Sequence, residues 1–414
     1  MAPTDDAARY APDSPYAWLR LAIALIVGTA ACVGTWSVVV VLPSVQQEFG
    51  TLRAGASLPY TCVMLGFGFG NIAMGRIADR YGILVPIVLG ALLLGGGYMI
   101  AGVTQTLWQF ALVHLFIGVG GGAGFSPLIA DLSHWFRRHR GLAVVFGASG
   151  SYLAGVIWPQ VITWGVAHHG WRATHIGIGL AVLAVMLPFA GFFRRRPSAA
   201  SLAAAEAASA GARGDLGLTP NQLQWLLAVA GFSCCVAMAM PQVHIVAYCG
   251  DLGYGVARGA EMLSLMLALG IISRIGSGFV ADRIGGAATL ALGSLMQGLA
   301  LFLYLWFDGL TSLFIVTGIF GLFQGGIVPM YAVIIREYLP AREAGTRIGI
   351  VMSATILGMA FGGYVSGAIF DAFASYRAAF LNGLAWNLLN LAIVCWLMMR
   401  ARRASSGGSL PASA

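Results

Sequence analysis

The sequence has no lysine and little charge of any kind. All 23 basic residues are arginine, and charged residues make up 9% of the 414 positions. Without lysine, the chain can form neither a Walker-type phosphate loop nor a Schiff base. An ordinary soluble domain contains about 25% charged residues. A chain this apolar, with a mean hydropathy of +0.83, must therefore have lipid as its main solvent.

Signs of enzymatic or metal chemistry are also missing. The six cysteines lie in or beside apolar segments without metal-ligand spacing, and we interpret them as small buried hydrophobic residues. There is no His-Glu-x-x-His, no Gly-x-Ser-x-Gly and no pair of aspartates inside an apolar segment. We expect no enzyme activity, no cofactor and no metal site. The first 16 residues lack a cleavable signal pattern, so the first apolar segment is expected to stay in the mature protein.

The sequence does contain twelve mostly apolar segments, each long enough to span a membrane as a helix of about 20 residues. They run near residues 19–42, 57–77, 83–103, 107–131, 141–166, 173–193, 223–249, 259–281, 287–306, 311–337, 346–370 and 377–400. Most connections are short, but 194–222 is rich in Ala, Gly and Ser and is interpreted as a flexible cytoplasmic linker. The predicted fold class is an all-α membrane protein built from two similar six-helix bundles. The bundles cover 17–193 and 223–400, with tails at 1–16 and 401–414.

The arginines are distributed unevenly between the two sides of the predicted membrane. Four lie on one side, 18 on the other, and one lies inside a span. The four are Arg53, Arg172, Arg258 and Arg377, and the one inside a span is Arg274. Because cytoplasmic loops are enriched in arginine and lysine, we expect a multi-pass protein of the cell membrane with both termini in the cytoplasm. This bias explains the net charge of +8 without nucleic acid as a partner.

The chain carries an internal repeat with an offset of 203 positions. The pattern Gly-x-x-x-Asp-Arg-x-Gly follows the second span and occurs again after the eighth. Its matched residues are Gly75, Asp79, Arg80 and Gly82 in the first copy and Gly278, Asp282, Arg283 and Gly285 in the second. Spans 4 and 10 are also alike, since each has several glycines followed by a proline, Pro127 or Pro329. Two such units in the same orientation are typical of parallel repeats.

This duplicated loop resembles the signature loop of the major facilitator superfamily, and the resemblance covers the chain from about residue 17 to about residue 400. The first copy lacks the further basic residues that the family pattern has after Gly82, and the second lacks a basic residue at Phe279. The resemblance implies a twelve-helix transporter that works by alternating access. In such a carrier, residues 17–193 would rock against residues 223–400.

A second stretch, Trp-Phe-Arg-Arg-His-Arg-Gly at 135–141, is similar to one in the monocarboxylate transporters and the oxalate–formate antiporter group, with a weaker partner, Arg-Glu-Ala-Gly, at 342–345. It implies a carrier of small organic anions, above all monocarboxylates, and leaves proton symport open. The alternatives are an exchanger or exporter of other organic acids or drugs, and, from other classes, a channel or an intramembrane enzyme. The expected partners are the organic anion, protons if they are coupled, and the lipid bilayer. A functional monomer is expected.

The charged residues of the two loops suggest latches on the cytoplasmic side. Asp79 lies at a helix end, where a carboxylate can meet the N-terminus of a neighbouring helix, and Arg80 is expected to pair with Asp131. The counterpart in the second half would be formed by Asp282, Arg283 and Glu337. We interpret both sets as contacts that break when the cytoplasmic side opens. The alternative is ordinary interfacial ion pairing.

Arg274 is the leading candidate for a substrate contact. It lies eight residues, or about 12 Å of helix, before Asp282 at the end of its span, and half of a hydrocarbon core is about 15 Å. An arginine at this depth costs roughly 3 kcal/mol, so it must face a polar cavity or a partner. No Asp or Glu lies at the same depth, and an unpaired guanidinium fits a carboxylate. The alternative is a structural arginine bonded to backbone carbonyls.

The resemblance adds three expectations about this arginine. In the carboxylate carriers, an arginine on span 8 holds the substrate carboxylate, and that role falls on Arg274 here. Oxalate-type carriers have a second cation on span 11, whereas this chain has no basic residue from Ile348 to Asp371, so a monocarboxylate is favoured. Animal monocarboxylate carriers have a proton-coupling Asp where this chain has Gly270, which puts the proton mechanism in question.

The interrupted spans 4 and 10 point to the position of the cavity. Further candidates for substrate binding near that depth are Trp36, Tyr152, Gln324 and Tyr331, and the candidates for proton transfer are His114 and His244. Titratable side chains within a membrane are commonly functional. For each of these six residues, ordinary helix packing is the alternative.

Overall fold

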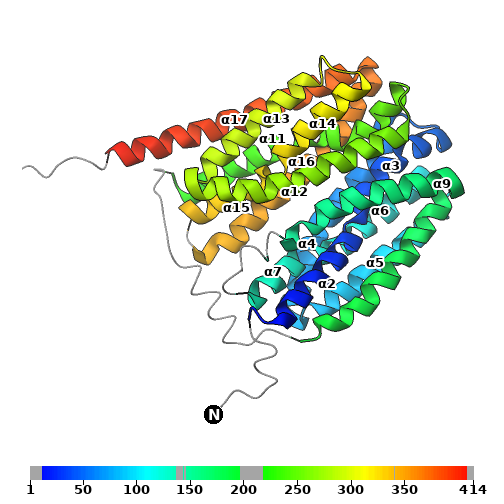
Figure 1. The fold of residues 1–414 in the computed structure, drawn as a ribbon, viewed down its shortest axis with the longest axis horizontal. Helices are drawn as coiled ribbons and strands as arrows, with labels where there is room; N and C mark the ends of the chain where they lie inside the picture. Colours follow the sequence, from blue (N-terminus) through cyan, green and yellow to red (C-terminus); the bar gives the residue numbers. More distant parts are fainter. Residues whose placement is uncertain (1–11, 137–142, 144–145, 196–217, 340, 408–414) are drawn as a thin grey trace, which may run out of the picture.

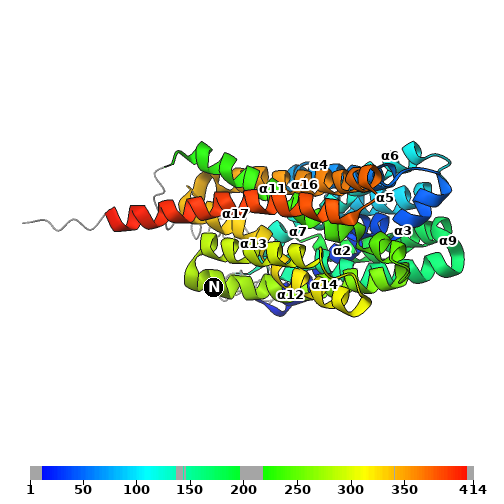
Figure 2. The same ribbon diagram turned by 90° about the horizontal axis from the view of Figure 1, so that it is seen from above.

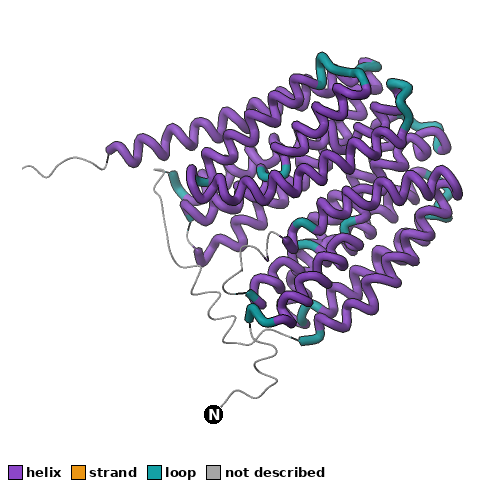
Figure 3. The backbone as a smooth tube through the Cα atoms, viewed as in Figure 1, coloured by secondary structure: helices purple, strands orange, loops and turns teal. Residues whose placement is uncertain are grey.

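The computed structural model describes residues 12–136, 143, 146–195, 218–339 and 341–407. These residues form helices joined by short connections, and no strand occurs among them, as Figure 3 shows. The helices of the first half are α2 (Pro15–Ala31), α3 (Val33–Glu48), α4 (Arg53–Tyr81), α5 (Leu84–Ala101), α6 (Leu107–Gly121), η1 (Gly122–Gly124), α7 (Ser126–Trp135), α9 (Gly150–Ala190) and η2 (Gly191–Phe193). Those of the second half are α11 (Pro220–Asp251), α12 (Val256–Ile284), α13 (Gly286–Leu303), α14 (Leu310–Gln324), α15 (Ile327–Tyr338), α16 (Ala341–Phe373) and α17 (Tyr376–Gly407).

Eleven helical segments of the described chain are long and apolar enough to cross a membrane. The longest, Phe146–Phe193, contains Gly170, whose φ of 76° is not helical. The chain folds back on itself there, at the label α9 in Figure 1. A Cβ placed on Gly165 would lie only 2.8 Å from the side chain of Thr174, on the returning arm. This segment therefore crosses twice, which gives the twelve crossings that the sequence predicted and confirms the fold class.

The internal repeat is reproduced in the packing. A Cβ placed on Gly118 of α6 would lie 2.2 Å from the carbonyl oxygen of Val63 in α4. A Cβ placed on Gly321 of α14 would lie 2.2 Å from the carbonyl oxygen of Met266 in α12. Both glycines and both partners are 203 positions apart. The same close helix approach, which only glycine permits, is therefore built twice.

Four crossings are interrupted among the described residues, and one of these breaks is at Ser149 in the fifth crossing. The fourth breaks between α6 and α7 through η1, and the tenth breaks between α14 and α15 at Gly325 and Gly326. Both breaks were expected from the glycine and proline pattern. The first crossing also breaks, at Cys32 between α2 and α3, which the sequence pattern did not indicate. Breaks inside a membrane are tolerated where the freed backbone groups are buried in protein or line a cavity.

The helix ends differ slightly from the predicted bounds. Helix α2 begins at Pro15 because Ser14 caps it, and α11 begins at Pro220 because Thr219 forms a capping box with Gln222. Helix α17 continues to Gly407, past the predicted end of the last span. Most of the predicted linker, 196–217, and the outer parts of both tails lie outside the described residues.

The two halves lie side by side, and three helix pairs of the described chain make the most extensive contacts between them. These pairs are α4 with α16, α9 with α12, and α3 with α11. Figure 1 shows the first half, blue to green, beside the second half, green to red. In both views α17 runs along the second half and extends past the other helices at one end (Figures 1 and 2). The boundary between the halves is where a site shared by both can form.

Candidate functional site

Arg274 lies at the boundary between the halves. It is on α12 and is 8% exposed, and its Cζ atom lies 4.2 Å from the centre of the Tyr152 ring on α9. Its Nη1 donates to the carbonyl oxygen of Ala148 at 3.1 Å, and its Nε donates to that of Gly325 at 3.4 Å. The first half thus supplies an aromatic face and a carbonyl to an arginine of the second half. Such a contact must change when the halves move.

No carboxylate balances this arginine within the described residues. Its two carbonyl contacts match the structural alternative raised from the sequence, but they occupy only two of the five N–H donors of a guanidinium. The ring of Tyr152 adds a cation–π contact, which stabilises an arginine by about 0.5–2 kcal/mol without removing its net charge. Donors and charge therefore remain for an anionic ligand.

Gly270 explains why a carboxylate is missing one turn before Arg274. A Cβ placed on Gly270 would lie 2.5 Å from Cε1 of Tyr152, inside its van der Waals contact distance. An aspartate at position 270 cannot coexist with the tyrosine ring in this position. In this chain the face of Tyr152, and no acid of the described residues, covers the arginine.

Trp36 extends the site on the side of the first half. Its Nε1 donates to the carbonyl oxygen of Ser151 at 2.9 Å, next to Tyr152. A Cβ placed on Gly155 would lie 2.9 Å from the Trp36 ring and 2.1 Å from Leu267 of α12. Helices α3, α9 and α12 therefore meet here with little space between them. Trp36, Tyr152 and Arg274, chosen from the sequence, fall in one neighbourhood.

Gln324 and Tyr331 are placed differently from each other. Gln324 is fully buried at the end of α14, next to Gly325, and its Oε1 accepts from Nε2 of Gln242 on α11. It adjoins the carbonyl that holds Arg274. Tyr331 donates to Oδ1 of Asn390 on α17 at 2.8 Å and is fully buried in the second half. The structure thus places Gln324, but not Tyr331, beside the residue whose carbonyl holds Arg274.

The two candidate proton carriers serve helix packing in this structure. His114 hydrogen-bonds through Nδ1 to the carbonyl oxygen of Phe110 at 2.7 Å, and its ring lies 5.8 Å from that of His175, inside the first half. His244 contacts the carbonyl oxygen of Gly363 on α16 through Nε2 at 2.9 Å. A ring nitrogen bonded to a carbonyl must carry the proton. These contacts agree with the packing alternative for both histidines.

The expected pair of Arg80 with Asp131 is wrong. Asp131 is bound by Arg20 of α2, with Nε to Oδ2 at 2.8 Å and Nη2 to Oδ1 at 2.9 Å. Arg80 is exposed, and its guanidinium lies over the ring of Tyr81. Arg20 reaches the carboxylate because its guanidinium is held between the rings of Trp135 and Phe193, 4.7 and 4.8 Å away.

The two repeated loops share one backbone conformation. Gly82 and Gly285 end α4 and α12 with φ values of 83°, a region in which glycine is favoured. Glu337 accepts the backbone N–H of Gly286, at the start of α13, at 2.9 Å. It thus contacts the second loop through a helix N-terminus. The side chains of Asp79 and Asp282 lie outside the described set, and Arg283 is exposed. The latch role of these loops stays a prediction.

Charged contacts between the halves lie at the opposite end, which we call the Arg53 end. Arg53 of α4 binds Oδ2 of Asp251 through Nη2 at 2.6 Å, and the hydroxyl of Tyr376 donates to the same oxygen at 2.6 Å. The carboxylate of Asp371 accepts the backbone N–H groups of Arg53 and Ala54 at 2.8 and 2.7 Å. Across the boundary, Arg53 and Ala54 of the first half supply the donors and the second half supplies both acids, whereas the contact of Tyr376 with Asp251 lies within the second half. The Arg53 end is therefore closed.

Sequence reasoning missed this network, although one signal was available. Arg53 is one of the four arginines that lie against the charge bias, and Asp251 and Asp371 end spans on the same side of the predicted membrane. Arg53 and Asp371 are 318 positions apart. Pairing them required knowledge of which helices are neighbours.

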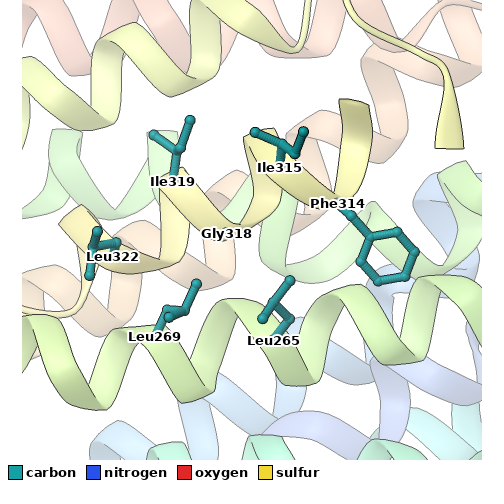
Figure 4. Close-up of a pocket in the computed structure, with 7 residues that line it drawn as sticks. All are labelled: Leu265, Leu269, Phe314, Ile315, Gly318, Ile319 and Leu322. Atoms are coloured by element: carbon teal, nitrogen blue, oxygen red, sulfur yellow. The ribbon is translucent and has the colours of Figure 1, made fainter. Parts of the chain in front are cut away.

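A groove between α12 and α14 is not a candidate for this site. It has a volume of about 400 Å³ and is shown in Figure 4. Its lining consists of Leu265, Leu269, Phe314, Ile315, Gly318, Ile319 and Leu322. None of these side chains can hydrogen-bond to an anion, and Ile315 is 59% exposed. Among the described residues, no group of three or more His, Cys, Asp or Glu could hold a metal ion.

Comparison with known proteins identifies the family. The profile of the Major Facilitator Superfamily matches residues 24–320 and 277–412. Monocarboxylate transporter 13 of Bos taurus is 25% identical over 332 residues, which cover 80% of this chain and 77% of that protein. The Fujikurins efflux protein of Gibberella fujikuroi is 28% identical over 307 residues, which cover 72% of this chain and 63% of that protein.

A solved structure shows the same fold. It is that of a bacterial homolog of the human lysosomal transporter Spinster in an inward-facing and occupied conformation. It is 16% identical, has a TM-score of 0.71, and covers 95% of this chain and 98% of that one. The resemblance stated from the duplicated loop is thus confirmed: the chain belongs to the major facilitator superfamily.

Proposed function

We propose that this protein is a secondary active carrier of small monocarboxylate anions and that Arg274 binds the carboxylate. The observation that carries the proposal is a guanidinium, 8% exposed, at the boundary between the halves with no acid beside it in the described residues. A carboxylate accepts two parallel N–H bonds from a guanidinium. Family membership supports the transporter class, and the relatives named monocarboxylate transporter 13 support the substrate class.

The surroundings of Arg274 favour a ligand with a single negative charge. The anion would neutralise the arginine, and the loaded site would then be neutral without a proton. The pairing of Gly270 with Tyr152 removes the acid that couples a proton in the animal carriers. Any proton symport must therefore use another group, and the packing contacts of His114 and His244 give no support to either as that group.

We also propose an orientation in the cell membrane. The arginine bias places the repeated loops and both termini in the cytoplasm, so the Arg53 end faces outward and the structure is closed to the outside. A monomer suffices, since both halves of the site come from one chain. Labelling of a cysteine introduced beside Arg53 by a membrane-impermeant reagent, on intact cells, tests the orientation. Labelling only after permeabilisation would contradict it.

A second candidate function is export of larger organic acids. It is favoured by relatives named as efflux proteins for fujikurins and agnestins. The same arginine would bind the acidic group. Uptake by inside-out and right-side-out vesicles of a small acid, pyruvate, and a large aromatic acid, salicylate, separates the two candidates, because each predicts one preferred size.

The direct test of the proposal is pyruvate binding to the purified protein by calorimetry. Arg274→Gln should weaken binding roughly 10- to 100-fold, since hydrogen bonds to a charged group are worth about 1.5–3 kcal/mol. Arg258→Gln is the matched control, because Arg258 forms an exposed pair with Glu261 three residues away. Unchanged affinity in the Arg274 variant would overturn the assignment.

A further inference from the structure

The Arg53 end contains a second arrangement of donors suited to a carboxylate. Helix α4 begins at Arg53, and its first N–H groups have no partner within the helix. The backbone N–H groups of Arg53 and Ala54 each donate to one oxygen of Asp371, at 2.8 and 2.7 Å. The N-terminus of a 29-residue helix also carries a partial positive charge. A carboxylate is thus held by two backbone donors and the helix end.

The side chain of Arg53 adds an unused donor to this place. It is 4% exposed, yet its Nε has no hydrogen-bond partner in the described structure. Its Nη2 binds Asp251, and its guanidinium lies over the ring of Phe370, the residue before Asp371, at 5.1 Å. A buried N–H without a partner costs about 1–3 kcal/mol. The arginine therefore has capacity for one more acceptor beside the ring of Phe370.

Asp371 occupies these donors only while the halves are together. It belongs to α16 of the second half, and the donors belong to α4 of the first half. The approach depends on Gly367, one turn before Asp371, where an added Cβ would lie 3.1 Å from Cα of Ala54. When α16 moves away from α4, the donors are left without Asp371.

The place is distinct from the Arg274 site. Helix α12 begins at Val256 near the Arg53 end, and Arg274 lies 18 residues further on, which is about 27 Å along the helix axis. Two carboxylate-binding places along one route would let an anion be held first at the entrance and later at the boundary between the halves.

We infer that the start of α4 with Arg53 is an entrance site for monocarboxylate anions, which Asp371 fills when this end is closed and a free carboxylate fills when it is open. The identity of the carried anion rests on the proposed function, but the receptor itself does not. A bound anion holds Asp371 away, so the Arg53 end closes only after the anion has left for the interior. Asp371 therefore competes with the ligand for the backbone N–H groups of Arg53 and Ala54.

Chemical rescue tests this inference directly. Asp371→Ala removes the carboxylate and leaves room for acetate, which carries the same group. The experiment measures the thermal unfolding midpoint of the purified full-length protein with acetate or with neutral acetamide. It uses the Arg274→Gln background, so that acetate binding at the other site cannot contribute. Acetate at ten times its dissociation constant should raise the midpoint by roughly 2 °C in Asp371→Ala, and acetamide should not.

Three controls decide the outcome. The rise should be absent with Asp371 intact, because the site is filled, and absent when Arg53→Gln is added. Glu48→Ala removes an outer carboxylate that pairs with Arg172 inside the first half. An equal rise in that variant would show that acetate binds any arginine that has lost its carboxylate partner. That result would overturn the proposal. A rise with acetamide, or no rise with acetate, would overturn it as well.

A smaller variant covers the case in which Asp371→Ala does not fold. Asp371→Ser retains an oxygen that can accept one of the two backbone N–H groups, and formate fits the smaller space. Stabilisation by formate but not by formamide supports the entrance site, and no response contradicts it. Because every arm carries Arg274→Gln, loss of the proposed substrate site leaves these results unchanged. The pyruvate calorimetry reports on that site separately.

Discussion

The two ends of the molecule hold their charges in different ways. At the Arg53 end, Arg53 of the first half meets Asp251 and Asp371 of the second. At the end with the repeated loops, the described pair of Arg20 with Asp131 lies within the first half. Charges at one end therefore tie the halves together, whereas charges at the other end stabilise one half. The repeated Gly-x-x-x-Asp-Arg-x-Gly motif lies at the end where the described ion pair does not join the two halves.

This difference suggests that the two ends of the molecule have different roles. The repeated loops have the same backbone turn in each half, as the equal φ values of Gly82 and Gly285 show. The contacts that join the halves at the Arg53 end come from residues outside the repeat pattern. In an alternating-access carrier, such contacts must be strong enough to close one end and weak enough to release it, which suits partly exposed pairs such as Arg53 with Asp251.

The largest expected effect is at the pair within one half. Arg20→Gln leaves Asp131 buried without its cation, and breaking a buried pair costs about 3–5 kcal/mol. The side chains are 0% and 7% exposed, so solvent gives little relief. Thermal unfolding of the purified variant should show a large loss of stability. A loss similar to that of an exposed pair would remove the distinction between the two ends.

Replacing both partners sharpens the same prediction. The double variant Arg20→Leu with Asp131→Leu removes both charges and should recover much of the lost stability, because the buried charge is gone. If the double variant is as unstable as Arg20→Gln, the cost comes from lost packing against Trp135 and Phe193 and not from the charge.

An intermediate effect is expected at the pair between the halves. Asp251→Asn weakens the contact with Arg53, and because the Asp251 side chain is 42% exposed, the change should be about 1 kcal/mol, or roughly fivefold in the ratio of closed to open Arg53 ends. The measurement is the rate at which a thiol reagent modifies a cysteine placed at Thr51. Glu48→Gln is the control, since its partner Arg172 lies in the same half. Equal acceleration in both variants would contradict the assignment of Asp251 to closure.

The smallest effect is expected at Arg258. It pairs with Glu261 on the surface of α12, with side chains 54% and 39% exposed. Arg258→Gln should change the unfolding midpoint by less than the equivalent of about 0.5 kcal/mol and leave thiol accessibility at Thr51 unchanged. A larger effect would show that distant surface charge, and not the contacts between halves, governs the Arg53 end.

The sequence predicted the features that depend on local pattern. Hydropathy predicted the twelve crossings, and the glycine and proline pattern predicted the breaks at the fourth and tenth crossings. The 203-residue offset predicted two similar halves, and the structure shows matched packing at Gly118 and Gly321. Counting charges by depth selected Arg274. What could not be predicted depends on which distant segments become neighbours. Asp131 pairs with Arg20 and not with Arg80 because α2 lies beside α7. The spacing of these residues in the sequence does not reveal that the two helices are neighbours.

The fit of Gly270 to Tyr152 is another example. From the sequence alone, the only notable feature of position 270 is that it holds glycine and not an acidic residue. In the structure, the ring of a residue 118 positions away takes the space of that side chain and covers Arg274. The sequence also offered Tyr331 as a site residue, although its hydroxyl is engaged with Asn390. Depth alone does not show which face of a helix a side chain occupies.

The most direct test of the account is counterflow of labelled pyruvate into liposomes preloaded with unlabelled pyruvate. Protein with native Arg274 should accumulate label transiently, and so should the Arg258→Gln control. Arg274→Gln, at equal protein and with an unchanged unfolding midpoint, should lose this accumulation at concentrations that saturate the native protein. Accumulation by Arg274→Gln with native half-saturation would contradict the central claim that this arginine, shared between the two halves, carries the anion.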